Sequence, residues 1–323
     1  MATAPRIFVP EGLYHVTSEG VFGSNIFEDD DIKTLFSNEL TITLNKYNYT
    51  CRSWSVENNQ YHLVVKASEI SISLFMQRLN SVFAKKFNVI KKRRGVVFCK
   101  RFASIIVQDN DDYFKTLLKY VHLNPVSSGC CTIEELCNHR WCGHAALLNL
   151  DGDDPILDKV AVFKFFAGDD PVGSYLKFVV SEIYNENEKY LIEKIRAANL
   201  GLKSYENSNP HIIGDSNFIT ETLNRYWQRK NAIAERCKLS LPLETIQEKV
   251  EVHCKINGGD LFRQGRENEI SKARHIFAYI GVTLFNYTCV QLAEFLKVSA
   301  SAVSRMVGRG STLDINDISL VGS

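Results

Sequence analysis

The spacing of apolar and polar residues predicts alternating strands and helices over the first 130 residues. Strands are predicted over 12–17, 50–56, 60–66 and 96–107. Helices are predicted over 29–46, 69–92 and 109–125, with Pro125 ending the last one. The resulting order of β, α, β, β, α, β, α favours an α+β fold, in which a mixed antiparallel sheet carries helices on one face.

The rest of the chain has a mostly helical pattern. Residues 131–253 are acidic, with loops expected at their glycine and proline breaks. Two short helices are predicted over 289–296 and 300–307, joined by a turn. We therefore expect the chain to divide into parts 1–130, 131–253 and 254–310 and a tail, 311–323.

The composition is that of an ordinary globular protein. Hydrophobic residues make up 45% of the chain and charged residues 23%. No apolar stretch reaches the roughly 18 residues that a membrane helix needs, and the N-terminus lacks the apolar segment of a signal peptide. We expect a cytoplasmic protein, a monomer or dimer with no membrane partner, whose nine cysteines are reduced.

The net charge of +1 hides a segregation of charge along the chain. Residues 1–130 hold 16 Lys and Arg against 12 Asp and Glu, residues 131–253 hold 14 against 19, and residues 254–310 hold 8 against 4. Basic segments attract polyanions such as nucleic acids. The densest basic run consists of Lys85, Lys86, Lys91, Lys92, Arg93 and Arg94. We interpret it as a DNA contact, with a solvated helix end as the alternative.

The two short C-terminal helices have the spacing of a helix-turn-helix. Lys297 occupies a turn position that favours glycine, because the backbone there is left-handed, and Ser299 can cap the second helix. The residues expected to contact duplex DNA are Ser301, Ser304, Arg305 and, near phosphates, Arg309. An ordinary helical hairpin in a core is the alternative.

Two pairs of polar residues carry candidate chemistry. On a strand, Gln60 and His62 point to one face and Tyr61 to the other, so an amide oxygen and an imidazole nitrogen can reach one metal ion. On a helix, Tyr120 and Asn124 lie one turn apart on the same face, so a phenol stands beside an amide. Taken singly, each pair has a structural alternative: a packed strand histidine, or a core tyrosine with a capping asparagine.

Together the two pairs suggest a metal-assisted reaction. Hard oxygens and an imidazole suit Mg²⁺ or Mn²⁺. Such an ion polarises a phosphodiester and positions a tyrosine for in-line attack. The products are a free 3′-hydroxyl and a 5′-phosphotyrosine, which is chemistry suited to cutting and rejoining single strands.

Several short stretches occur in a recognisable order over the first 126 residues. They are Pro5-Arg6, 12–17 (GLYHVT), 27–29 (FED), 59–63 (NQYHL), 75–80 (FMQRLN), 101–104 (RFAS) and 119–126 (KYVHLNPV). This set resembles the REP-associated tyrosine transposases, the insertion-sequence-200-like branch of the HUH single-strand nucleases. Tyr175 lies in a stretch that fits the longer members more weakly, and these members also end in a helix-turn-helix.

The resemblance implies a ferredoxin-like HUH domain that acts in DNA transposition and recombination on repeat or hairpin DNA. It implies that Tyr120 is the catalytic nucleophile and that His62 and Asn124 hold the metal, with Gln60 where the family has the first histidine. Arg101, in one of the matching stretches, joins the DNA-binding candidates. We therefore predict a metal-dependent single-stranded DNA endonuclease and strand transferase.

This chain departs from the family pattern near the expected site. Gln60 replaces a histidine, Glu19 replaces an arginine, and Glu57-Asn58-Asn59 lacks the family's proline. These changes leave a second class open, a catalytically decayed DNA-binding protein or transcription regulator. An RNA-binding protein ranks last, because the usual aromatic stacking motif is missing.

A separate group of ligand-type residues lies outside these motifs. It consists of Cys131, Cys137, His139, Cys142 and His144. Their spacing does not fit a paired zinc site, and Trp141 among them favours packing. His15 has a packing or substrate-facing role, and His122, out of phase with Tyr120, is expected to be structural.

Overall fold

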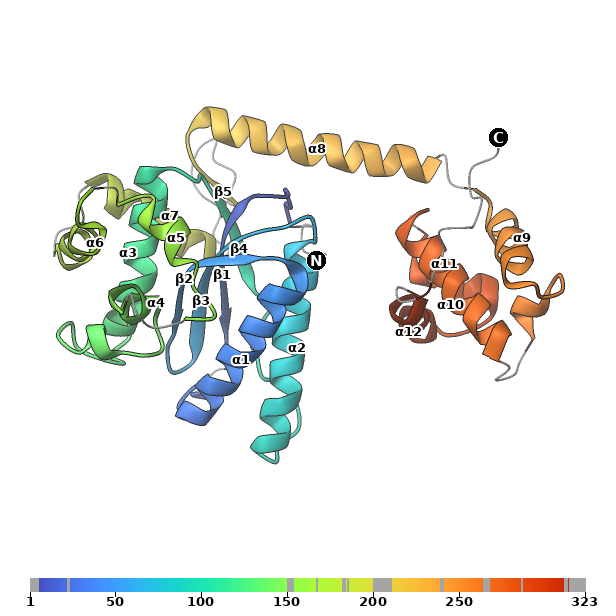
Figure 1. The fold of residues 1–323 in the computed structure, drawn as a ribbon, viewed down its shortest axis with the longest axis horizontal. Coiled ribbons are helices and arrows are strands. Elements are labelled where there is room, and N and C mark those ends of the chain that lie inside the picture. Colours follow the sequence, from blue (N-terminus) through green and yellow to red (C-terminus); the bar gives the residue numbers. More distant parts are fainter. Residues whose placement is uncertain are drawn as a thin grey trace. The chain divides into compact units, whose positions relative to one another are not determined.

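A computed structural model describes most of the chain (Figure 1). The described residues are 6–21, 24–149, 154–166, 168–181, 184, 186–199, 211–238, 241–263, 268–285, 287–310 and 313. Contacts group the chain into two compact units, 1–226 and 227–323. No described helix is both long and apolar enough to cross a membrane. Of the predicted tail, only Leu313 lies within the described residues, and Pro5 lies outside them.

A five-stranded sheet forms the centre of the first unit. Its strands are β1 (Leu13–Glu19), β2 (Thr50–Val56), β3 (Gln60–Lys66), β4 (Ala103–Val107) and β5 (Ile212–Ile213). The order is β2-β3-β1-β4-β5, antiparallel except for the parallel pair of β4 and β5. The α+β prediction is confirmed. The strand region predicted over 96–107 is a strand only from residue 103 onward.

Two helices cover one face of this sheet: α1 (Asp30–Tyr47) and α2 (Ile72–Ile90) (Figure 1). The Tyr61 ring of β3 lies 4.5 Å from the Phe36 ring of α1. Acidic residues in the first turn of α1 suit the positive end of its dipole. The Ser71 side chain accepts a hydrogen bond from Leu74 N and so begins α2 three residues later than predicted.

The helix α3 (Asp111–Ser127) lies on the opposite face, so the prediction that the helices cover one face is wrong. The physical reason is that successive residues of β3, from Tyr61 to Val65, are all buried, which requires cover on both sides. The prediction that Pro125 ends α3 is also wrong by two residues. Pro125 lies inside the last turn, where the helix closes with a hydrogen bond from Ser128 N to Asn124 O.

Further short helices pack against the same core as α3. They are α4 (Gly143–Leu148), α5 (Lys159–Phe163), α6 (Pro171–Val180), α7 (Glu186–Asn199) and the 3₁₀ turn Leu136–Asn138. Tyr175 and Ile195, for example, are fully buried in that core. The contacts thus place the first half of the acidic segment with the sheet. The division expected at 130, 253 and 310 remains a prediction about function.

The helix α8 (Ser216–Lys238) begins in the first unit, and the second unit has a helical core of its own. Its helices are α9 (Leu243–Cys254), α10 (Asn268–Thr283), α11 (Cys289–Leu296), α12 (Ala300–Gly310) and the 3₁₀ turn Asp260–Phe262. Lys297 ends α11 in the left-handed conformation, with φ 54°, as predicted for this turn. Ser299 Oγ accepts a hydrogen bond from Ala302 N, as a cap does.

Candidate functional site

The strand β3 sends its two predicted ligands to the face that α3 covers. Tyr61 points into the aromatic cluster of α1 and α2, and its hydroxyl bonds Asn80 Oδ1 at 2.5 Å. His62 points the other way, with its ring 5.8 Å from the Tyr120 ring. Gln60 lines the same cavity as His62 and Tyr120. The predicted alternation along the strand, and the meeting of the two candidate pairs, are therefore observed.

His62 is held by a second histidine from the neighbouring strand. His15 Nε2 lies 3.0 Å from His62 Nδ1, and the two rings stack. Burial lowers the pKa of His62 to about 3, and burial and the nearby His62 lower the pKa of His15 well below its usual value. Both rings are therefore neutral at physiological pH. His15 has a positioning role, because it is fully buried and its Nε2 engages His62.

Tyr120 is buried except for about a twelfth of its surface, at 8% exposure. Burial raises the pKa of its phenol, an effect that Arg196 and Asn124 counteract. The Arg196 guanidinium lies 5.9 Å from the centre of the Tyr120 ring. The expected contact between Tyr120 and Asn124 is thus present, and Arg196 is an unforeseen partner.

A cavity of about 250 Å³ opens over these side chains. Its lining includes Thr17, Glu19, Gln60, His62, Lys100, Arg101, Tyr120 and Arg196. Three basic groups therefore line the same cavity as the phenol. Lys100 forms an ion pair with Glu19, at 3.6 Å, so one of the cations is partly neutralised. Arg101 lies at the predicted site, as the sequence motif suggested.

Glu57 is a further member of the site that sequence reasoning left without a role. It lies in the turn between β2 and β3, and its side chain is 1% exposed. Oε1 accepts a hydrogen bond from Ser55 Oγ at 2.9 Å, while Oε2 lies 3.7 Å from His62 Nε2. Burial raises the pKa of Glu57 to about 7, and the side chains of Ser55 and Gln60 act in the opposite direction.

The turn that carries Glu57 is held by close backbone contacts. Gly20 N donates to Asn59 O at 2.8 Å, and a Cβ on Gly20 would lie 2.3 Å from Asn59 Oδ1. Val56 N donates to Trp141 O, so the segment before α4 covers the other side of the turn. These contacts come from distant parts of the chain, and no local motif signals them. The available signal in the sequence was that an acidic residue, Glu57, lies a few positions before Gln60 and His62.

The run from Lys85 to Arg94 lies at the end of α2 and in the turn that follows, and none of its residues lines the cavity at Tyr120. Two of its lysines bind carboxylates: Lys86 pairs with Glu39 and Lys91 with Asp29. Lys85, Lys92 and Arg94 are exposed. In the second unit, Ser301, Ser304, Arg305 and Arg309 are exposed on α12.

Two members of the cysteine and histidine group after α3, Cys142 and His144, belong to a buried packing network, whereas Cys137 is exposed. His122 Nδ1 and His144 Nδ1 both contact the hydroxyl of Tyr175, at 2.7 and 2.5 Å. Cys142 Sγ donates to His122 O. Within the described residues, no three His, Cys, Asp or Glu side chains gather closely enough to hold a metal ion.

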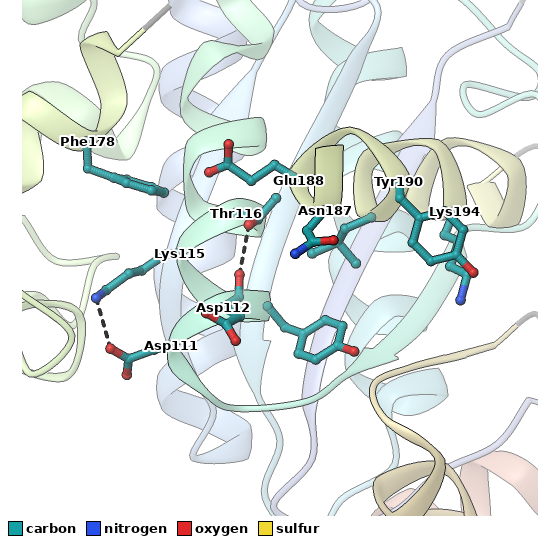
Figure 2. A pocket seen from close by; sticks show the side chains of 11 residues that line it. Asp111, Asp112, Lys115, Thr116, Phe178, Asn187, Glu188, Tyr190 and Lys194 are labelled. Carbon is teal, nitrogen blue, oxygen red and sulfur yellow. Dashed lines mark hydrogen bonds and ion pairs between the residues drawn. The ribbon is translucent and has the colours of Figure 1, made fainter. Parts of the chain in front are cut away.

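A larger cavity of about 560 Å³ lies between the start of α3 and α7 (Figure 2). Tyr113 borders it from α3, and Tyr190 and Lys194 border it from α7. The acidic groups Asp112 and Glu188 also line it, and Tyr120 does not. The cavity with the larger volume is therefore not the one that holds Tyr120 and His62.

A comparison with protein families matches the part of the chain that holds His62 and Tyr120. Residues 11–124 match the family model described as "Transposase IS200 like", so this part of the chain is similar to the transposases of that family. The resemblance predicted from the sequence is confirmed over this stretch. The matched range includes the sheet strands β1 to β4 and ends at Asn124.

Among solved structures, one similar chain is described as "Structure of the REP associates tyrosine transposase bound to a REP hairpin". It has 13% sequence identity and a TM-score of 0.39, and the likeness covers 52% of this chain and 93% of that one. A search of curated proteins finds no match.

Proposed function

We propose that the first unit cleaves and rejoins single-stranded DNA, with Tyr120 as the nucleophile. The observation that carries this proposal is the meeting of the Tyr120 phenol, the His62 imidazole and three basic side chains at one cavity. The phenol and the imidazole come from the stretch that is similar to IS200-like transposases. A phenol, a neutral imidazole and cations suit attack on a phosphodiester better than attack on an uncharged substrate.

In the proposed reaction, the Tyr120 oxygen attacks the phosphorus of a scissile phosphodiester. A bond from phosphorus to the phenolic oxygen forms, and the bond from phosphorus to the 3′-oxygen breaks. The phenolic proton of Tyr120 passes to water, and the departing 3′-oxygen takes up a proton from water. One ester bond replaces another, so the step is reversible and a 3′-hydroxyl can rejoin the strand.

The basic side chains bind and orient the phosphate. Arg101 and Arg196 border the cavity and can donate to its non-bridging oxygens, since a guanidinium matches two phosphate oxygens. Arg196 also lowers the pKa of Tyr120 and thereby opposes the effect of burial. This second effect favours the phenolate that attack requires.

The site fits a divalent metal ion. His62 Nε2 is buried without a hydrogen-bond partner, while Nδ1 of the same ring is engaged by His15, as is typical of a metal-binding histidine. His62 and Asn124, with Gln60 or a neighbouring oxygen, would hold Mg²⁺ or Mn²⁺. When bound, the ion polarises the phosphodiester.

Incubation of the protein with a labelled DNA hairpin and Mn²⁺ tests the proposed activity. We expect a covalent protein–DNA band on a denaturing gel for the wild type and none for Tyr120→Phe. Equal product from both proteins would refute the role of Tyr120. The oligonucleotide should include single-stranded flanks, since base stacking and backbone charge provide the grip on single strands.

A second candidate is a protein that binds DNA without cutting it, and Glu19 favours it. This carboxylate lies in the cavity and pairs with Lys100, which reduces the local attraction for a phosphate. Such a protein would bind the hairpin and form no covalent adduct. The same gel, combined with a binding assay, separates the two candidates.

The second unit is proposed to bind duplex DNA next to the cleavage site. Ser301, Ser304 and Arg305 share the exposed face of α12 and would enter a major groove, with Arg309 close to phosphates. The Lys85–Arg94 run would supply further phosphate contacts to the first unit, mainly through Lys85, Lys92 and Arg94.

A further inference from the structure

Glu57 and His62 face each other in a way that hydrogen bonding does not explain. Glu57 Oε2 and His62 Nε2 lie 3.7 Å apart, and both atoms are buried without a hydrogen-bond partner. A buried carboxylate oxygen without a partner costs free energy, because it has lost water and gained nothing. Two such atoms side by side indicate a binding position for a partner that both can contact.

The other atoms of both side chains are already engaged. His62 Nδ1 contacts His15 Nε2 at 3.0 Å, and Glu57 Oε1 accepts from Ser55 Oγ at 2.9 Å. With the proton of His62 on Nδ1, its Nε2 presents a lone pair toward the lone pairs of Glu57 Oε2. Two acceptors facing each other repel unless a proton or a metal cation lies between them, and a divalent ion also offers Nε2 and Oε2 a shared partner.

The separation of the two atoms suits ligands of one ion. Metal bonds of about 2.1 Å at angles of 90–120° separate two ligand atoms by roughly 3.0–3.6 Å. The observed 3.7 Å therefore needs a shift of only a few tenths of an ångström. A carboxylate also carries the negative charge that a hard divalent cation prefers and that a neutral amide lacks.

Gln60 has a different relation to this pair. Its side chain forms a hydrogen bond with Glu57, so the amide is placed to orient the carboxylate. Tyr120 stands on the open side of the pair, with its ring 5.8 Å from that of His62. An ion held by Glu57 and His62 would thus lie beside the phenol.

We propose that Glu57 is a metal ligand of this chain, taking over the task of the histidine that Gln60 replaces. His62 Nε2 and Glu57 Oε2 bind the divalent ion together, and Gln60 is a positioning residue for Glu57. This assignment rests on the proposed function and makes it specific, since it gives the site a charged ligand from the turn between β2 and β3.

Mn²⁺ binding to the full chain without DNA tests the assignment. Isothermal titration or the Mn²⁺ electron paramagnetic resonance signal gives the affinity directly. For Glu57→Gln we expect the affinity to fall about tenfold or more, by analogy with the effect of losing groups that support a metal site. Glu39→Gln, which alters a buried carboxylate paired with Lys86 on the other side of the sheet, should bind Mn²⁺ as the wild type does. Equal affinity of the wild type and Glu57→Gln overturns the assignment.

A second variant keeps the test decisive if Glu57→Gln does not fold. Glu57→Asp retains the charge on a shorter side chain. We expect its Mn²⁺ affinity to lie below that of the wild type and above that of a protein that lacks the carboxylate ligand. An affinity for the aspartate variant equal to that of the wild type, with Gln60→Ala also unchanged, likewise overturns the assignment. Thermal melting with and without Mn²⁺ monitors folding in the same samples.

The outcomes separate this assignment from the proposed function. A normal covalent adduct from Glu57→Gln, with unchanged Mn²⁺ affinity, removes Glu57 from the site and leaves the nuclease intact. Mn²⁺ binding that depends on Glu57, with no adduct from the wild type, supports the metal site and removes the cleavage activity.

Discussion

His15 Nε2 lies 3.0 Å from His62 Nδ1, with both rings buried between β1, β3 and α3. The two residues come from adjacent strands, and their cross-strand bond fixes the orientation of the His62 ring. Nε2 of His62 then points toward Glu57 and away from the strand partner. The contact with His15 thus engages Nδ1 of the buried His62 and leaves its Nε2 without a hydrogen-bond partner, pointing toward Glu57.

Replacement of His15 should therefore weaken metal binding without removing a ligand. We expect His15→Phe to lower the Mn²⁺ affinity by about 10- to 100-fold, because the His62 ring loses its hydrogen-bond partner. His15→Gln retains an amide that can bond Nδ1 and should lose less. Mn²⁺ titration of the three proteins measures the effect, and equal affinities would show that His15 only packs.

The substitution Gln60→His restores the residue type that the family pattern has at this position. We expect higher Mn²⁺ affinity or more covalent adduct, because imidazole is a stronger donor than an amide. Adduct yield on hairpin DNA and Mn²⁺ titration measure the two effects. If neither changes, then another departure from the family pattern, for example Glu19, limits the activity of the site.

Arg196 should contribute to cleavage through its position beside the phenol. We expect Arg196→Ala to lower the single-turnover rate of adduct formation by about a hundredfold, which is typical for loss of a charged transition-state contact. Lys194→Ala is a matched control, since Lys194 lies on the same helix but lines the larger cavity (Figure 2). Equal losses in both variants would indicate a general effect of charge on DNA binding.

Buried histidines should make the fold less stable in acid. Burial lowers the pKa of His144 to about 4, whereas an unfolded histidine titrates near 6.5. Between these values the unfolded state binds more protons, so the free energy of unfolding falls as the pH drops from about 6.5 to 4. His144→Gln should reduce this slope by about one proton. Denaturant unfolding at several pH values measures it, and Tyr175→Phe, which keeps both histidines, should retain the slope.

Arg305 should contribute to duplex binding through phosphate or base contacts. We expect Arg305→Ala to weaken binding and to reduce the slope of log affinity against log salt by about one if the contact is to phosphate. Lys272→Ala, which removes a cation from α10 of the same unit, serves as the control. Fluorescence anisotropy with a labelled duplex over a salt series gives both quantities. An unchanged affinity would leave α12 as a packing helix.

Local patterns were enough to predict the order of strands and helices in the first 130 residues and which side chains share a face of one strand or helix. The strands at 50–56 and 60–66 were correctly bounded, because alternation and a short turn are encoded in neighbouring residues. The same alternation placed His62 opposite Tyr61, and helical spacing placed Asn124 beside Tyr120. These relations depend on backbone geometry within a few residues, so the sequence carries them by itself.

Only the tertiary structure decided which groups complete the site. Arg196, which lies 76 positions after Tyr120 in the sequence, contacts its ring. Glu57 is buried beside His62 because the segment before α4 covers its turn. The placement of α3 on the second face of the sheet likewise followed from burial on both sides. Such contacts arise when segments far apart in the sequence share one core. Their geometry depends on the packing of the whole unit, and the local spacing of apolar residues does not predict it.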